Sequence, residues 1–345
     1  MTSPVRAADL TVLCTRAAQL AGADRHAAAL LAAATVAAEQ ARNRAVGIAH
    51  FFDYLQAYRD GRIASGVAPV VTRPAPACLV SDARDGLAQV AFDAASAAVR
   101  ARTRQHGVAC LWLRSCFTCG ELGHYPRQLA AEGFVAVAAA NSPALMAVGG
   151  SGTPVLGTNP MAYAVPRPGR TPFVVDQATS ATAYVNVRDA ARDSRSIPPG
   201  WAVGPDGKPT TDATRALSGA LLPFGAHRGG NVALLVELLA TLAGASFSVD
   251  APPFDSGQDP PGIGVFVLCL DPALFGGPER TDGFLARLQT AHGVSLPAMA
   301  DQAPADPVFL DTDLHRRLLD ASAPHGFVPH NASPTTTDER RARNT

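Results

Sequence analysis

Long stretches rich in alanine and other apolar residues dominate the first sixty positions and predict helices. Two of them span residues 5–22 and 24–42, and Asp24 is suited to cap the second by accepting backbone N–H groups. A third helix is expected from about His50 to Arg59, ending at the turn-forming sequence DGRIASG. We therefore expect residues 1–76 to form an N-terminal helical region.

After this region the pattern changes to short, continuous apolar runs that predict strands. The predicted strands span residues 77–83, 108–115, 134–142, 161–166, 172–178 and 264–270. Helical patterns such as residues 89–107 separate several of them, so the fold class is α/β, and runs apolar throughout indicate a sheet covered on both faces. Residues 77–275 are expected to form the central α/β domain.

The stretch NVALLVELLATLAG, residues 231–244, predicts a helix that is apolar nearly all round. Such a helix should be buried, and its Glu237 should then need a hydrogen-bonding partner. Residues 276–330 are expected to form a C-terminal helical region. Residues 331–345 contain almost no large apolar side chain, which predicts a disordered tail.

Composition narrows the function classes. The chain has 345 residues, of which 47% are hydrophobic and 17% charged, and its 29 Lys and Arg balance 29 Asp and Glu. This balance gives no general attraction to nucleic acid or to an anionic membrane. Charges at Arg6, Asp9 and Arg16 argue against a signal peptide, and Glu237 interrupts the longest apolar stretch, which is too short to span a bilayer. We expect a cytoplasmic protein.

The six cysteines do not form a dense disulfide framework, which suits a reducing compartment. Cys116 and Cys119 have C-x-x-C spacing, but no second pair or nearby histidines complete a zinc site, so no metal is expected. A thiol-redox role for the pair is an alternative to plain packing.

Glycines in residues 149–160, GGSGTPVLGTNP, do not match the G-x-G-x-x-G pattern that opens a helix after a strand. The stretch leads into another strand and predicts tight turns. A Rossmann-type nucleotide site is therefore not expected here.

Polar residues at the end of the strand 172–178 indicate a ligand site. Asp176, Thr179 and Ser180 lie between this strand and an expected helix, where hydroxyls and free N–H groups suit an anionic or sugar-rich ligand. Asp176 has the alternative role of a helix cap, and Thr158 and Asn159 are either ligand groups or turn residues.

Several segments together resemble the malate/L-lactate dehydrogenase family, which includes sulfolactate dehydrogenase and the piperideine-2-carboxylate reductases. They are SPALMAVGGSGTPVLGTNP, LGTNPMAYAVP, FVVDQATSA and the long segment from IPPGWAVG to HRGGNVALLVELLA. The resemblance covers roughly residues 5 to 300. It implies a non-Rossmann dinucleotide-binding sheet domain, NADH or NADPH as cofactor, a homodimer, and hydride transfer to a small molecule.

The resemblance also implies that residues 175–181 line the cofactor, with Asp176 near the nicotinamide. His227 and Arg228 lie among glycines, where a cation suits phosphate, although a solvated loop is the alternative. The full set of expected cofactor residues is Thr158, Asn159, Val175, Asp176, Gln177, Ala178, Thr179, Ser180, Ala181, His227 and Arg228.

The chain departs from the family in its acid–base residues. Many members carry S-H-G-x-x-R, whose His donates a proton and whose Arg binds the substrate carboxylate; here Val46 and His50 occupy those two positions. Three further family motifs are altered. Residues 117–120 stand at the family's N-H-F-G, with Thr118 in place of the His. Residues 183–186 replace A-R-G-K, and LPAMA, residues 296–300, replaces L-P-G-x-R.

Reduction of a ketone needs a proton donor, so we expect another group to replace Val46. His50 is the first candidate, because it titrates near neutrality and lies four residues further on. Asp176 and Thr118 are further catalytic candidates, and His124 is a weaker one.

Besides the thiol-redox alternative, three functions remain open from the sequence. The first is NAD(P)H-dependent reduction of a small 2-oxo acid, or its reverse. The second is reduction of a cyclic imine, whose protonated nitrogen makes the missing donor less important. The third is a catalytically inactive cofactor-binding protein. In each case we expect a small-molecule ligand and a homodimer, without nucleic-acid or membrane partners.

Overall fold

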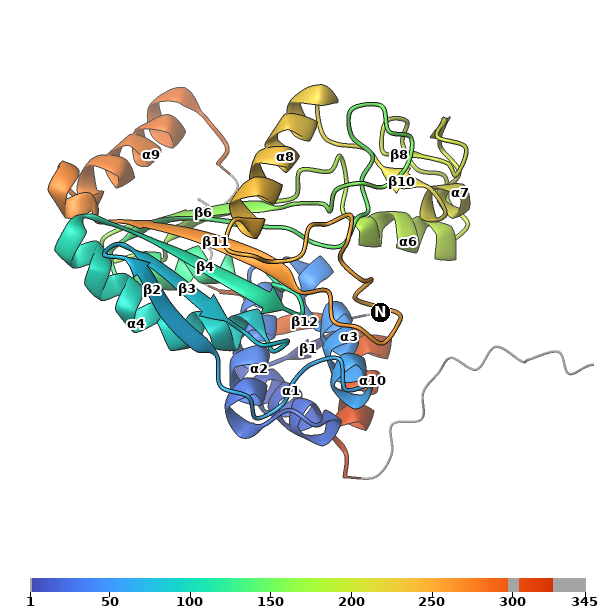
Figure 1. The fold of residues 1–345 in the computed structure, drawn as a ribbon, viewed down its shortest axis with the longest axis horizontal. Helices are drawn as coiled ribbons and strands as arrows, with labels where there is room; N and C mark the ends of the chain where they lie inside the picture. The colour runs from blue at the N-terminus through green and yellow to red at the C-terminus, as the bar shows by residue number, and fades with distance from the viewer. Residues whose placement is uncertain (1, 297–303, 325–345) are drawn as a thin grey trace, which may run out of the picture.

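The computed structural model describes residues 2–296 and 304–324, and Figure 1 shows their arrangement around a central sheet. Among these residues, seven strands form the sheet in the order β2-β3-β4-β11-β5-β6-β7, with only β3 and β4 parallel. The strands are β2 (Val70–Ala75), β3 (Cys78–Asp82), β4 (Val108–Cys116), β5 (Val135–Ala140), β6 (Met161–Val165), β7 (Phe173–Gln177) and β11 (Ile263–Leu270). All six predicted strands are confirmed.

Helices α4 (Ala88–His106) and α5 (His124–Ala131) cover one face of this sheet. Their side chains and those of the strands form a hydrophobic core that includes Phe92, Leu111 and Tyr125, each at most 1% exposed. Alternate residues of β4 point into this core, because successive side chains of a strand face opposite sides.

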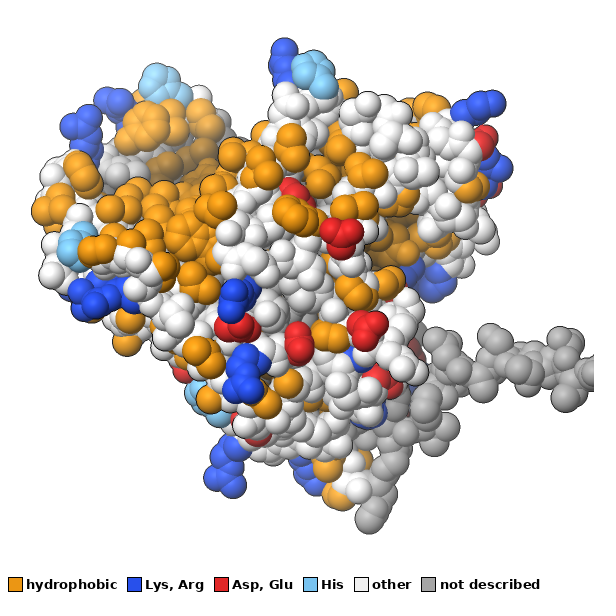
Figure 2. Space-filling model, viewed as in Figure 1, with side chains coloured by type: hydrophobic (Ala, Val, Ile, Leu, Met, Phe, Trp, Pro, Cys, Tyr) orange, Lys and Arg blue, Asp and Glu red, His pale blue; other side chains and the backbone are white. Residues whose placement is uncertain are grey.

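The opposite face carries α8 (His227–Thr241), which packs on β11, β5 and β4. One side of α8 is buried through Ala233 and Val236, but Leu234, Leu235, Leu238 and Leu242 are 49–70% exposed. The predictions of an all-round buried helix and of a sheet covered on both faces are therefore wrong for the single chain. One helix is too narrow to cover this face, and Figure 2 shows hydrophobic side chains gathered over the sheet between α9 and α8.

The predicted N-terminal helices are confirmed as α1 (Ala7–Ala21), α2 (Arg25–Gln40) and α3 (Ile48–Arg59), with a short 3-10 turn, η1 (Arg44–Val46), before α3. Asp24 caps α2 as predicted, accepting from the N–H groups of His26 and Ala27 at 2.9 and 3.0 Å. β1 (Thr2–Val5) pairs antiparallel with β12 (Val308–Asp311), and α10 (Thr312–Ser322) packs on α1. Both ends of the described chain thus join one helical layer (Figure 1).

A smaller unit lies beyond the sheet, built on α6 (Tyr184–Arg192) and α7 (Ala213–Leu217). Within the described residues it holds three short strands, β8 (Ala202–Val203), β9 (Pro209–Thr210) and β10 (Ala220–Leu221), in the order β10-β8-β9. Met146, Val187 and Ile197 belong to its own small core. The glycine-rich residues 149–160 run from this unit into β6 through turns, as predicted.

Downstream of β11, the short η2 (Pro272–Phe275) leads into α9 (Pro278–His292), which stands at one end of the sheet. The predicted tail, residues 331–345, and most of the LPAMA segment lie outside the described residues. In the described ranges, no helix has both the length and the apolar character needed to cross a bilayer.

Candidate active site

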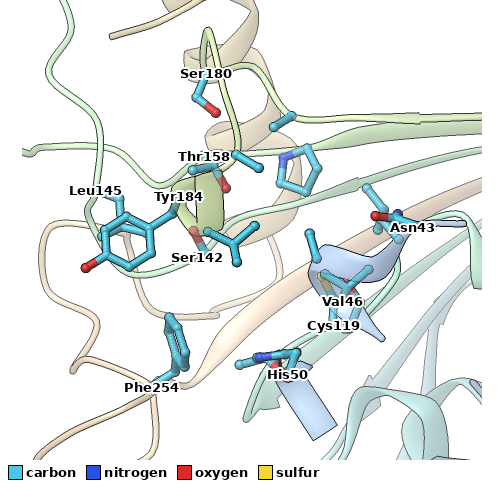
Figure 3. A pocket seen from close by; sticks show the side chains of 18 of the residues that line it. Asn43, Val46, His50, Cys119, Ser142, Leu145, Thr158, Ser180, Tyr184 and Phe254 are labelled. Atoms are coloured by element: carbon cyan, nitrogen blue, oxygen red, sulfur yellow. Dashed lines mark hydrogen bonds between the residues drawn. The ribbon is translucent and has the colours of Figure 1, made fainter. Parts of the chain in front are cut away.

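A pocket of about 520 Å³ lies where the helical layer, the sheet and the smaller unit meet. This volume is typical of pockets that hold small molecules or parts of cofactors. Figure 3 shows Val46 and His50 on one side of it and Tyr184 and Ser180 on the other. The sequence-predicted residues that line it are His50, Thr118, Thr158, Asp176, Gln177, Ala178 and Ser180.

The family's donor and carboxylate positions both face this pocket. Val46 lines it from η1, and its side chain has no proton to exchange. His50, on the first turn of α3, places Nδ1 2.8 Å from Oδ2 of Asp53 and Nε2 3.3 Å from Oγ1 of Thr118. Because Asp53 occupies Nδ1, Nε2 is the ring nitrogen left for chemistry with a ligand.

Thr118 extends this contact to a buried tyrosine. Its hydroxyl lies 2.5 Å from the hydroxyl of Tyr54, which is on α3 one turn after His50. Burial raises the pKa of Tyr54 well above its usual range, so the phenol stays neutral. His50, Thr118 and Tyr54 thus form one hydrogen-bonded chain at the pocket wall.

Asp176 lies at the end of β7 on another wall. Its Oδ2 accepts the backbone N–H of Gly123 at 2.8 Å. Burial, with a smaller contribution from Glu121, raises the pKa of Asp176 to about 6. Arg127 opposes the shift, but its guanidinium is held by Glu121 at 2.6 and 2.8 Å. The group is therefore a carboxylate at neutral pH that takes up a proton in mild acid.

The C-x-x-C pair does not have the properties of a redox pair. Cys116 and Cys119 are free thiols, with Cys116 buried in the sheet core and Cys119 on the pocket wall. Burial raises the pKa of Cys116 well above its usual range and that of Cys119 to about 12. Redox thiols need a lowered pKa, so the packing interpretation is favoured.

Two of the predicted cofactor residues support the pocket from behind instead of lining it. Asn159 is fully buried and donates to the carbonyl of Ala233 at 3.0 Å and to Oε2 of Glu237 at 2.8 Å. Thr179 donates to the carbonyl of Thr158 through both its backbone N–H and its hydroxyl, each at 2.9 Å. These bonds fix the backbone that presents Thr158 to the pocket.

The predicted need of Glu237 for a partner is confirmed. Besides Asn159, it accepts from the backbone N–H and the hydroxyl of Ser248 at 2.6 and 2.5 Å, and from Asn141 at 3.4 Å. This carboxylate therefore joins α8, the G-T-N-P turn and the loop before β11.

The remaining predicted residues lie outside the pocket lining. His227 and Arg228 are exposed at the start of α8, whose preceding residue, Ala226, gives no side-chain cap. Val175 packs against the cluster of Phe173, and Ala181 donates its N–H to the carbonyl of Leu222 at 2.7 Å. Burial lowers the pKa of His124 to about 4, so this imidazole is neutral at physiological pH.

Several pocket residues were missed from the sequence, among them Asp53, Tyr184, Arg188 and Phe254. Asp53 follows His50 by three residues on a helix, and this spacing was a usable signal. Phe254 meets the His50 ring at a centroid distance of 5.6 Å from a loop far along the chain, and no local pattern announces that contact.

The family model for malate/L-lactate dehydrogenase matches residues 5–329. The chain belongs to this family. It is 34% identical to a Delta(1)-pyrroline-2-carboxylate reductase of Ancylobacter novellus, over 86% of this chain and 90% of that one. It is 33% identical to a (2R)-3-sulfolactate dehydrogenase (NADP(+)) of Chromohalobacter salexigens, over 83% of this chain and 86% of the other.

A solved structure agrees with this assignment. The delta1-piperideine-2-carboxylate reductase of Pseudomonas syringae superposes with a TM-score of 0.85 at 30% identity, covering 93% of this chain and all of that chain. The predicted α/β fold, without a Rossmann motif, and the predicted oxidoreductase class are thus confirmed. The protein is an enzyme of a family of reductases and dehydrogenases.

Proposed function

We propose that this enzyme reduces a small cyclic imine that carries a carboxylate, with NADH or NADPH as the hydride source. The observation that carries the proposal is Val46 on the pocket wall, at the position of the family's proton donor. A protonated imine already bears its proton on nitrogen and has an electrophilic carbon. Its reduction therefore needs hydride but no donor at position 46.

Asp176 supplies what such a substrate needs from the protein. Ionised above about pH 6, its carboxylate lies on the pocket wall and stabilises a positively charged imine nitrogen. The backbone N–H of Gly123 holds the carboxylate in place. Asp176 would thus keep the imine nitrogen protonated for hydride transfer.

The residues present fit a nicotinamide cofactor. Thr158, Ser180 and residues 176–178 line the pocket with backbone and hydroxyl groups. The start of α6 also lines it, and Ala183 before that helix gives no side-chain cap, so the N–H groups of Tyr184 and Val185 can bind an anionic or amide group. The bound cofactor supplies the hydride, and these residues orient it. We assign His227 and Arg228, at the start of α8, to its phosphates.

The test is a comparison of substrates with both cofactors. Pyrroline-2-carboxylate and piperideine-2-carboxylate are each compared with pyruvate and longer 2-oxo acids, following the absorbance of the reduced nicotinamide. We expect kcat/KM for the cyclic imines to exceed that for the 2-oxo acids by at least about tenfold. Faster reduction of every 2-oxo acid than of either imine would reject the proposal. Binding of NADPH and NADH without turnover of any substrate would identify a cofactor-binding protein instead.

Reduction of a 2-oxo acid is the second candidate, and the hydrogen bond between His50 and Asp53 favours it. A histidine whose Nδ1 is held by a carboxylate is a common arrangement for a general acid. In this reaction Nε2 of His50 gives its proton to the carbonyl oxygen. Thr118, within hydrogen-bond distance of Nε2, helps to fix the imidazole ring.

We further propose that the enzyme is a cytoplasmic homodimer. The exposed leucines of α8 and the apolar side chains over the adjacent sheet form a larger hydrophobic surface than a monomer usually leaves in water (Figure 2). All six cysteines, which lie within the described residues, are free thiols, as in a reducing compartment.

A further inference from the structure

The charged groups of the pocket are few and unevenly placed. Asp53 and Asp176 bring two carboxylates to its walls, and His50 is joined to the first of them. Among the lining residues that the structure describes, Arg188 is the one Lys or Arg. A substrate carboxylate therefore has few cationic partners in this pocket.

His50 is a poor partner for that carboxylate although it stands at the position of the family's Arg. Its Nδ1 is 2.8 Å from Asp53, so a protonated imidazole is already paired and a neutral one carries no charge. Asp53 also repels an approaching anion. The anion-binding function of this position is thus weakened by the neighbour three residues further on α3.

Arg188 lies on the opposite wall, where it can bind the carboxylate in place of His50. It follows Tyr184 by four residues on α6, so the two share one face of the helix, and both line the pocket. Tyr184 stands at the Arg of the family's A-R-G-K motif. Arg188 therefore places a cation one helical turn after the position of that Arg.

The surroundings of Arg188 leave its guanidinium available. The next arginine on the helix, Arg192, pairs with Asp189 at 3.1 Å and with Asp193 at 3.0 Å. In the described part of the chain Arg188 makes no ion pair. Burial and Asp255 raise the pKa of Tyr184, and the charge of Arg188 opposes this shift.

We propose that Arg188 binds the carboxylate of the substrate from α6, while Asp176 faces its cationic nitrogen. This inference rests on the proposed imine reduction and makes the substrate a zwitterion held between opposite charges. A guanidinium is well suited to the role because it binds carboxylates with two parallel hydrogen bonds. The enzyme then prefers carboxylated imines over the same rings without the carboxylate.

The test compares Arg188→Gln with Arg192→Gln, a matched change one turn further on the same helix. With pyrroline-2-carboxylate as substrate, we expect Arg188→Gln to raise KM by roughly 10- to 100-fold, the usual loss for a hydrogen bond to a charged group. With 1-pyrroline, which lacks the carboxylate, KM should change less than about twofold. Arg192→Gln should leave both values unchanged, and Arg188→Lys should restore part of the loss.

Binding of pyrrole-2-carboxylate, a planar analogue that cannot be reduced, separates this inference from the proposed reaction. Calorimetry in the presence of the oxidised cofactor should show binding to the wild type and a 10- to 100-fold weaker affinity for Arg188→Gln, about the same loss as in KM. That result supports Arg188 even if the wild type turns over no imine. Equal losses for 1-pyrroline and its carboxylate, an unchanged affinity for the analogue, or no binding to the wild type would each overturn it.

Discussion

Val46 occupies the position of the family's histidine, and the imidazole in this pocket belongs to His50, four residues further along the chain. The histidine then meets Asp53 on the same helix and Thr118 on the loop after β4. The hydrogen bonds of His50 are therefore made to two residues, Asp53 and Thr118, that lie outside the family's S-H-G-x-x-R motif. Substitutions of these residues therefore distinguish imine from ketone reduction.

His50→Ala should affect the two reactions differently. A positioned acid contributes roughly 10²- to 10⁴-fold to the rate, so reduction of a 2-oxo acid should fall by that factor. Reduction of a protonated imine should fall less than about tenfold, because the substrate brings its own proton. Steady-state rates of both reactions, measured on the same preparation, give the comparison.

Two further variants, Asp53→Asn and Val46→Ala, serve as controls for the effect of His50→Ala on ketone reduction. The first removes the charge beside Nδ1 and should move the pH dependence of ketone reduction, whereas the second should alter packing without moving it. Full retention of ketone-reducing activity and cofactor affinity by His50→Ala would make His50 a packing residue at a helix start.

Asp176→Asn should lower imine-reducing kcat/KM by about 10²- to 10³-fold, the usual loss for one electrostatic stabiliser. In the wild type, kcat/KM should fall as the pH drops through about 6, where Asp176 takes up a proton. The variant should lack this acidic limb. A pH–rate profile from mild acid to neutrality tests both statements, and an unchanged profile would contradict them.

The same variant should be slightly more stable at neutral pH. The pKa of Asp176 in the folded protein, about 6, is above its ordinary value of 3.8, so folding favours the protonated carboxyl. Its stabilisation is complete below about pH 3.8 and is lost as the pH rises through 6. Asn cannot ionise but still accepts the Gly123 N–H. Thermal denaturation near pH 8 should show a gain of roughly 2–4 °C that shrinks towards pH 4.

At the scale of elements, the Glu237 carboxylate accepts four hydrogen bonds that join α8 to the loops carrying Asn141, Asn159 and Ser248. In Glu237→Gln the new amide N–H₂ would face donors from Ser248 or Asn159, leaving buried polar groups unpaired. We expect a loss of about 2–4 kcal/mol in the free energy of unfolding, measured with urea. Glu132→Gln, a change of the same type at a partly exposed pair with Arg100, should stay within about 0.5 kcal/mol.

Elements with strong local patterns were predictable from the sequence. The α1 and α2 helices and the six predicted strands appear within about two residues of their expected bounds, because their apolar runs are long and their ends carry turn residues. β2 was missed because its sequence, VVTRPA, contains a proline and is exposed along its whole length at the sheet edge. β1 and β12 were missed because each is stabilised by a partner some 300 residues away.

The site was predictable only in part, for a related reason. Asp176 and Ser180 were found because polar residues at a strand end indicate a ligand site, and His50 was found because the resemblance to the family motif places it four residues after Val46. Arg188 and Phe254 were not found, because only the packing of α6 and of the 254 loop against the sheet brings them to the pocket. The same packing explains why Asn159 and Thr179 support the pocket instead of lining it.

At the scale of the whole molecule, the exposed leucines of α8 predict dimerisation. Light scattering should give twice the chain mass of 35.6 kDa. Leu238→Asp places a charge at the centre of this surface and should yield the monomer with little loss of fold, because the side chain is 55% exposed in the single chain. Val12→Asp, at a site on α1 that is 66% exposed, should leave the dimer intact. A monomeric wild type would reject this interface.

The central position of β11 delays completion of the sheet during synthesis of the chain. This strand inserts between β4 and β5, so each of these two strands keeps one unpaired edge until residues 263–270 emerge, although β3 and β6 pair with their other edges. β1 has no strand partner until residues 308–311, which form β12, have been made. Nascent chains therefore expose the inner edges of β4 and β5 until late in translation, and such unpaired edges favour aggregation during synthesis.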